Sequence, residues 1–323
     1  MIPAEAVERF RADLEQLTDG PPELFGVAVS GGPDSLALLL LAAAAYPGAV
    51  VAATVDHGLR ADSSGEAQNV AQICSAMGIE HNILRLDWTA PGSNIQARAR
   101  EERYNALGAW ATDRGVRVAA TAHHLDDQAE TLLMRLARGS GVAGLAGTRP
   151  IHPVPDEHCK HIAYFVRPLL AWRKHELADI VAAAGLEAVD DSSNHDARFD
   201  RSRARAFLAN VEWLRAERLA ATASHLKDAE IALGWMAAKL LSERRGRDRR
   251  DRLTIDVDDL PRELQRRILA YGVGLTGASG DFRGPKLARL LDQLRMGRSG
   301  TLAGVKVVPG PPWTFAPAPP RKS

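Results

Sequence analysis

The sequence has few cysteines and no long apolar run, and each shortage excludes a class of protein. Its longest apolar stretch, residues 36–46, is about half of the ~20 residues that a membrane-spanning helix needs, which excludes a transmembrane protein. The two cysteines, Cys74 and Cys159, form no CxxC pair, which argues against a disulfide framework, an iron–sulfur cluster or a thiol-relay enzyme. The N-terminus lacks the apolar core of a signal peptide, so we expect a cytoplasmic protein with no membrane partner.

The net charge of +1 hides an uneven distribution along the chain. Residues 1–215 carry 21 Lys and Arg against 28 Asp and Glu, whereas residues 216–323 carry 20 against 12. The length also suits two domains. We therefore predict a catalytic domain over residues 1–215 and a basic domain over residues 216–323 that binds a polyanion such as nucleic acid. Chance clustering of charge is the alternative.

Short strand-like runs alternate with longer helix-like segments through the first two hundred residues. Strands are expected at residues 24–30, 50–56, 81–87 and 116–122, and helices from residue 35 and across residues 66–77, 94–111 and 127–138. This alternation predicts an α/β fold with a doubly wound, mostly parallel sheet. Ligands of such sheets bind beyond the carboxyl ends of the strands.

The last third of the chain reads as a smaller, mainly helical C-terminal domain. A long helical region is expected to end near Arg245, and the charged residues 243–252 are expected to form a surface connection, because like charges repel within a packed element. A short strand and two amphipathic helices follow. The Pro-rich tail, residues 309–323, is expected to be extended or mobile.

The sequence Ser-Gly-Gly-Pro-Asp-Ser at residues 30–35 lies between a predicted strand and a predicted helix. Two glycines allow the backbone to turn tightly and to approach an anion, and a helix N-terminus directs its free N–H groups towards that anion. Pro33 suits the first helical turn, and Asp34 and Ser35 supply capping oxygens. We predict a phosphate-binding loop here; a capped turn without a ligand is the alternative. No Lys follows the glycines, so the loop is not a Walker A loop.

Residues 121–141 contain a second group of candidate functional residues. His123 and Asp127 are four residues apart, as are Asp126 and Glu130, so each pair is expected to share a helix face. His beside Asp could form a metal site, an acid–base pair or a solvated helix start. The GxGxxG run at residues 139–144 follows a helical segment and not a strand, so we interpret it as a glycine loop at a helix C-terminus.

The two cysteines are not expected to carry chemistry. Cys159 lies among three histidines, but the spacing matches no standard zinc site, and we predict none. Cys74 is expected to be a small core residue.

Six motifs in series resemble the tRNA(Ile)-lysidine synthetase family of the ATP pyrophosphatase (PP-loop) superfamily. They cover most of the first 205 residues, and each alone would be a weak signal. They are SGGPDS (30–35), VDHGLR (55–60), SNIQARAREERY (93–104), TAHHLDDQAETLLMRLARGSGVAGL (121–145), RPLL (167–170) and DDSSN (190–194).

The resemblance implies an enzyme that ligates free lysine to carbon 2 of the wobble cytidine of the isoleucine tRNA with a CAU anticodon. An adenylated cytidine would be the intermediate, and lysidine, AMP and pyrophosphate the products. ATP and Mg²⁺ are the implied cofactors. A homodimer is a further expectation that the sequence leaves open.

The resemblance also implies functional residues by position. The implied catalytic residues are Asp34, Arg103, His123 and Asp127, and Asp34 would also help to place Mg²⁺. The implied ATP-binding residues are Ser30, Gly31, Gly32, Pro33, Asp34 and Ser35. The implied tRNA-binding residues are Arg201, Arg203 and Arg205, for which a solvated arginine face is the alternative.

The reaction explains these residue types. Adenylation converts the cytosine carbonyl oxygen into a good leaving group, while Mg²⁺ and arginine offset charge on pyrophosphate. The lysine amine has a reference pKa of ~10.4 and must lose a proton before it attacks. Asp127, Asp34 or His123 could assist, and the sequence does not choose among them.

This chain departs from the family pattern at three places. Ser202 stands where the family usually has Asn, the proline commonly found shortly after this motif is absent from residues 207–214, and Ser192 replaces a frequent proline. Two alternative functions therefore remain: another adenylating tRNA modifier such as a thiolase, and a non-catalytic, nucleotide-gated RNA-binding protein.

Overall fold

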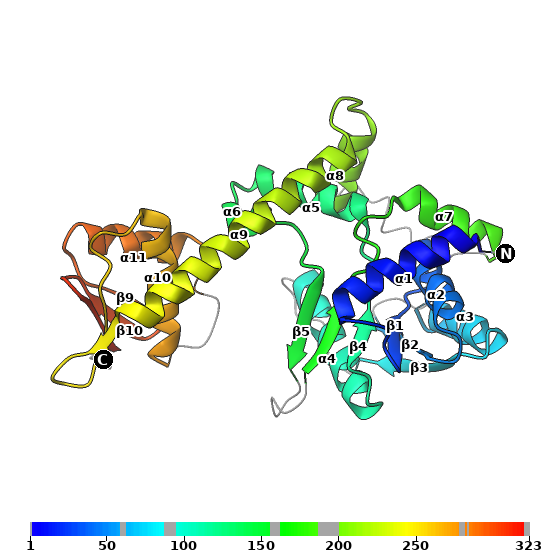
Figure 1. Cartoon of the computed structure of the whole chain (residues 1–323), viewed down its shortest axis with the longest axis horizontal. Coiled ribbons are helices and arrows are strands. Elements are labelled where there is room, and N and C mark those ends of the chain that lie inside the picture. Colours follow the sequence, from blue (N-terminus) through cyan, green and yellow to red (C-terminus); the bar gives the residue numbers. More distant parts are fainter. Residues whose placement is uncertain are drawn as a thin grey trace. The chain divides into compact units, whose positions relative to one another are not determined.

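The computed structural model of the chain describes residues 2–58, 63–86, 95–155, 162–186, 200–277, 282 and 284–319. The chain divides into two compact units, Met1–Leu226 and Lys227–Ser323 (Figure 1). Among the described residues, no helix is long and apolar enough to cross a membrane.

The first unit is built on a six-stranded sheet. Its strands are β1 (Phe25–Ala28), β2 (Val50–Asp56), β3 (Glu80–Arg85), β4 (Val118–Ala120), β5 (Ile151–Pro155) and β6 (Ile162–Val166). Its helices are α1 (Ala4–Thr18), α2 (Pro33–Ala45), α3 (Ser63–Ala76), α4 (Ile95–Asp113), α5 (Leu125–Ala137), α6 (Val142–Leu145), α7 (Lys174–Ala183) and α8 (Asp200–Ala209), and α9 (Ala216–Arg244) begins in it.

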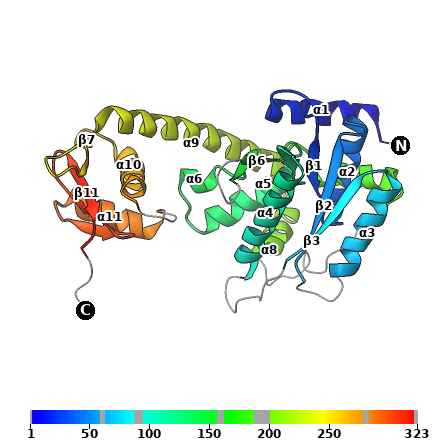
Figure 2. The same ribbon diagram turned by 90° about the horizontal axis from the view of Figure 1, so that it is seen from below.

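The strand order is β3-β2-β1-β4-β6-β5, and every neighbouring pair is parallel except β5 with β6. Figure 2 shows β1, β2 and β3 running together with α3 beside them. The strands that follow β1 in the sequence lie first on one side of it (β2 and β3) and then on the other (β4 and β6). This change of side confirms the predicted doubly wound, mostly parallel sheet.

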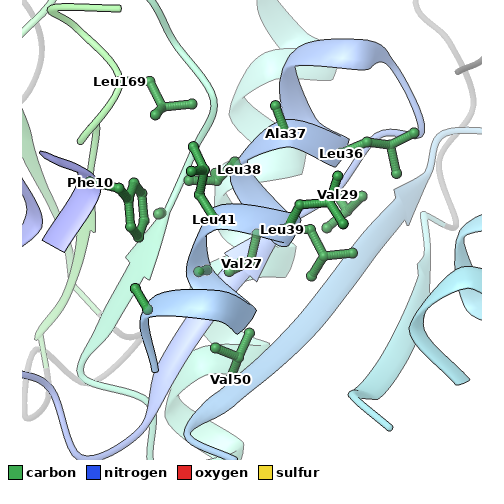
Figure 3. Packing of buried hydrophobic residues seen from close by; sticks show 14 of the residues in the cluster. Phe10, Val27, Val29, Leu36, Ala37, Leu38, Leu39, Leu41, Val50 and Leu169 are labelled. Atoms are coloured by element: carbon green, nitrogen blue, oxygen red, sulfur yellow. The ribbon is translucent and has the colours of Figure 1, made fainter. Parts of the chain in front are cut away.

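Successive residues of the central strands face two different hydrophobic clusters. Phe25 and Val27 of β1 join the cluster formed with α1, α2 and α7 (Figure 3), whereas Ala53 of β2 and Ala119 of β4 join the cluster formed with α4. This period of two places helices on both faces of the sheet. Helix α2 is apolar on nearly all sides, as expected of a helix enclosed by the sheet and its neighbours.

The second unit combines helices with a five-stranded antiparallel sheet. Its helices are the end of α9, α10 (Arg262–Leu275) and α11 (Pro285–Arg295). Its strands are β7 (Arg245–Arg247), β8 (Leu253–Ile255), β9 (Gly300–Leu302), β10 (Val305–Val308) and β11 (Trp313–Pro317), in the order β7-β8-β11-β10-β9. A separate core lies between this sheet and the helices.

Two sequence expectations for this unit are corrected. Residues 313–317 of the tail are extended, but they are not mobile: they form β11, in which Trp313 and Phe315 are buried. The prolines at 311 and 312 lie before this strand, where they interrupt none of its hydrogen bonds. Residues 243–252 lie largely on the surface, as expected, but they include β7, which pairs with β8. In the turn between these strands, aspartates at 248 and 251 pair with the neighbouring arginines.

Smaller expectations are also decided by the structure. Cys74 is fully buried in α3, as predicted, and Cys159 lies outside the described residues. Gly139 has φ +66° and follows α5, with its N–H donated to the carbonyl of Leu136 at 3.0 Å, so the glycine run ends a helix as predicted. The long helical region breaks between α8 and α9.

Gly26 of β1 allows the sheet to approach α4 closely. A Cβ built there would lie 3.0 Å from Trp110 and Val116 side-chain atoms and 3.1 Å from the Cβ of Ala119. Gly65 in α3, by contrast, has open space around the same position.

We predict that Gly26→Ala lowers the free energy of unfolding by about 1–3 kcal/mol, because the added methyl group overpacks the α4 face. Gly65→Ala is the matched control and should leave stability unchanged or raise it by up to about 1 kcal/mol. Urea unfolding of the two variants measures both values. Equal stability of Gly26→Ala and the wild type would contradict the close packing.

Candidate active site

The phosphate-loop candidate, residues 30–35, connects β1 to α2 at the carboxyl edge of the sheet. The N–H of Val29 continues the ladder to the carbonyl of Ala53 at 2.9 Å, and Gly31 then turns with φ +85°. Ser35 is buried; its hydroxyl donates to the carbonyl of Gly32 at 2.9 Å and accepts from the N–H of Ser30 at 3.1 Å. Ser35 therefore shapes the loop from within.

Asp34 stands in the first turn of α2 and faces the neighbouring loop. Its Oδ2 lies 3.4 Å from Nε2 of His124, while its buried Oδ1 has no hydrogen-bond partner among the described residues. A buried carboxylate oxygen without a partner is costly unless a ligand completes it. This oxygen is therefore a candidate ligand atom.

The second loop, between β4 and α5, is closed by a helix cap. His124 is the N-cap of α5: its N–H donates to Oδ2 of Asp127 at 3.1 Å, and its Nδ1 accepts from the N–H of Asp127 at 3.4 Å. Burial of the ring opposes protonation, but the hydrogen bond with Asp34 and the nearby carboxylates raise the pKa of His124 above its ordinary value. The sequence analysis missed this residue.

His123 precedes α5, so the expectation that it shares a helix face with Asp127 is wrong. Its Nδ1 lies 3.0 Å from the hydroxyl of Thr121 and 3.4 Å from Nε of Arg167. Burial lowers the pKa of His123 to about 3; nearby arginines act in the same direction, and Asp127 opposes them. His123 is therefore neutral at physiological pH.

Arg103 of α4 lies near the same loops. Its guanidinium carbon is 5.6 Å from the ring centre of Tyr104, and its charge lowers the pKa of both His57 and His123. Burial in turn lowers the pKa of Arg103 itself. The four residues implied as catalytic thus occupy one region at the carboxyl ends of the strands.

The three implied tRNA-binding arginines of α8 lie in different environments. Arg205 donates from Nε to Oε1 of the buried Glu130 at 2.7 Å, and Arg201 pairs with Oε2 of the same carboxylate at 3.2 Å. Arg203 is exposed and lies 4.0 Å from Asp200. Two of the three arginines therefore hold α8 against α5.

Asp126 and Glu130 face the same cleft, which confirms that they share one side of α5. Asp126 accepts from the N–H of Lys174 at 2.8 Å and from the guanidinium of Arg173, so the start of α5 is not simply solvated. Among the described residues, no group of three His, Cys, Asp or Glu side chains could hold a metal ion.

The glycine loop, the switch point of the parallel sheet and an Asp34 oxygen with no partner among the described residues together define a nucleotide-binding α/β protein of the PP-loop class. The family model described as "PP-loop domain" matches residues 6–212.

The particular family follows from the curated relatives. The chain is 46% identical to the tRNA(Ile)-lysidine synthase of Novosphingobium aromaticivorans over 98% of this chain and 95% of the relative. It is 41% identical to that of Zymomonas mobilis subsp. mobilis over 92% of this chain and 89% of the relative. This chain belongs to the tRNA(Ile)-lysidine synthase family.

A solved structure shares the fold. The U34-tRNA thiolase NcsA from Methanococcus maripaludis, solved with its [4Fe-4S] cluster, matches with a TM-score of 0.57 and 16% sequence identity, covering 71% of this chain and 79% of that chain. At this identity the likeness concerns the fold alone.

We predict that Arg205→Ala and Arg203→Ala differ in stability. Removing Arg205 weakens the compensation of a buried carboxylate and should cost about 1–3 kcal/mol, since Arg201 remains beside Glu130. Removing the exposed Arg203 should cost less than about 0.5 kcal/mol. Urea unfolding compares the two, and equal losses would contradict this assignment of the arginines.

Proposed function

We propose that this chain ligates lysine to carbon 2 of the wobble cytidine of the isoleucine tRNA with a CAU anticodon. ATP adenylates the cytidine, and lysidine, AMP and pyrophosphate are the products. The observation that carries the proposal is the 46% identity to a curated tRNA(Ile)-lysidine synthase along 98% of the chain. We further propose that the enzyme acts in the cytoplasm, on ATP, free lysine and tRNA.

The PP loop supplies the ATP site in this proposal. Backbone N–H groups of residues 30–35 and the positive end of α2 would bind the phosphates. Arg103 would offset the charge that develops on pyrophosphate as it leaves. The partly buried position of this arginine suits the role, because a charge acts more strongly where water is scarce.

Mg²⁺ fits one feature of this site. Oδ1 of Asp34 is buried and has no hydrogen-bond partner in the part of the chain that the structure describes. Mg²⁺ is commonly bound by one or two carboxylates together with substrate phosphates. When bound, the ion would offset negative charge on the triphosphate. Asp34 is the residue that would hold it, and His124 orients that carboxylate through Oδ2.

Two carboxylates are suited to binding the lysine ammonium and accepting its proton. The sequence left Asp34, Asp127 and His123 as candidates. The low pKa of His123 makes it a weak base at physiological pH, which favours the aspartates. Asp127 is 13% exposed, and the arginine nearest to it, Arg201, lies 3.8 Å from its Oδ1.

The purified chain, incubated with ATP, labelled lysine and the CAU-anticodon isoleucine tRNA, should place label on the RNA. Asp34→Ala should reduce this activity by at least about 10²-fold, because it removes the carboxylate at the phosphate loop and the partner of His124. Asp179→Ala, an exposed aspartate of α7, is the matched control and should remain active. The rate of lysine incorporation and of AMP release measures the effect.

The mass of the product nucleoside separates the alternatives. A gain corresponding to sulfur would favour a thiolase, and folded protein with neither product nor AMP release would favour a binding protein. Burial raises the pKa of the Cys74 thiol to about 11, so this cysteine does not supply the reactive thiolate at neutral pH. Cys74 therefore does not support the thiolase. A fully active Asp34→Ala variant would contradict the role given to that residue.

We also propose that the β7–β8 hairpin contacts tRNA phosphates. Asp248 orders its turn by accepting from the N–H groups of Arg250 at 2.9 Å and Arg252 at 3.0 Å. Arg249 and Arg250 are exposed, and no ion pair within the described part of the chain engages either of them. An ordered turn with two available guanidinium groups suits a phosphate backbone.

We predict that Arg249→Ser with Arg250→Ser weakens tRNA binding and lowers the slope of log affinity against log salt concentration by about 1–2, because fewer phosphate counterions are released. Arg289→Ser with Arg295→Ser removes the same charge from the exposed side of α11 and should change the slope less. Filter binding at several salt concentrations measures both. Equal slopes for the two double variants would show that net charge alone acts.

A further inference from the structure

Arg167 is a buried arginine directly after β6 whose guanidinium is held at several points. The residue is 3% exposed. Nη2 donates to the hydroxyl of Tyr104 at 3.0 Å, and Nη1 donates to the carbonyl of Arg149. The remaining nitrogen, Nε, donates to Nδ1 of His123 at 3.4 Å. The guanidinium is therefore fixed, and one of its donors reaches a residue of the candidate site.

This contact determines which nitrogen of His123 carries the proton. A guanidinium only donates hydrogen bonds, so Nδ1 of His123 must be the acceptor. The hydroxyl of Thr121, 3.0 Å away, can donate to the same nitrogen. A neutral imidazole carries one proton, which must then lie on Nε2.

Burial is the main cause that keeps the ring neutral. Arg100 and Arg103 of α4 and Arg167 after β6 disfavour the imidazolium, whereas Asp127 of α5 favours it. Burial of the ring acts in the same direction as the arginines. In this state Nε2 of His123 is a hydrogen-bond donor. The lone pair of Nδ1 is already engaged by hydrogen bonds from Arg167 and Thr121.

We propose that Arg167 is a positioning residue that fixes His123 in the Nε2–H tautomer, so that His123 meets the substrates as a hydrogen-bond donor and not as a base. The identity of those substrates rests on the proposed function, but the tautomer is a property of the free protein. A donor fixed in this way can stabilise negative charge that develops during adenylyl transfer.

The test is ¹⁵N NMR of histidine-labelled protein, with the His123 signals assigned by their loss in His123→Gln. Wild-type His123 should show the Nε2–H tautomer and no titration between pH 5 and 8. Arg167→Met, which keeps the length and loses the donors, should show mixed tautomers and a titration midpoint shifted towards the ordinary value of about 6.5. Arg135→Met is the matched control. Arg135 also donates hydrogen bonds to backbone carbonyls, but these are the carbonyls of Gly144 and Gly147 and not an atom of His123.

Activity supplies a second readout. Arg167→Met should lower kcat by about 10²-fold or more while changing the KM for ATP by less than about threefold, since the positioned donor acts on the reaction step. Arg135→Met should leave the His123 tautomer and its titration unchanged.

A wild-type His123 that carries its proton on Nδ1, or that titrates near pH 6.5, would overturn the proposal. So would an Arg167→Met variant with an unchanged tautomer. If that variant does not fold, the tautomer of wild-type His123 still tests the proposal. Tyr104→Phe, which removes one hydrogen bond to Arg167, should then partly reproduce the change in tautomer and titration midpoint. Absence of lysine ligation by the wild type would overturn the proposed function and leave the tautomer result standing.

Discussion

The site depends on one buried imidazole that joins two loops. Strands β1 and β4 are neighbours and parallel, so the PP loop and the loop before α5 leave the sheet at the same edge. His124, 1% exposed, caps α5 through Asp127 and reaches Asp34 at the start of α2. The N-termini of two helices are thereby fixed relative to each other, together with the carboxylates on which catalysis would depend.

Two adjacent histidines serve opposite electrostatic roles here. Burial is the largest effect on both rings and disfavours the charged form of each, but the charges around the two rings differ. The hydrogen bond with Asp34 and the three nearby carboxylates raise the pKa of His124. Burial lowers the pKa of His123 to about 3, and three arginines act in the same direction. The pKa values of two adjacent histidines in one loop are therefore shifted in opposite directions.

The sequence predicted the elements and motifs that depend on local pattern. The parallel sheet follows from apolar runs separated by helices, and the glycine turn at residues 30–35 from the strand before it. Burial of Cys74 and the helix end at Gly139 were likewise correct. The C-terminal sheet was missed because prolines 309, 311 and 312 conceal the alternation of Val305, Val307, Trp313 and Phe315, which becomes visible only once the prolines are assigned to a turn.

The electrostatics of the site could not be predicted in this way, because its determining partners are distant in sequence. Arg167 lies 44 residues from His123, and Arg205 lies 75 residues from Glu130. The family resemblance implied one role for Arg201, Arg203 and Arg205, yet helix packing turns two of them towards a buried carboxylate and leaves the third in solvent. A motif can therefore indicate which residues take part, whereas the proton each one holds is set by the fold around it.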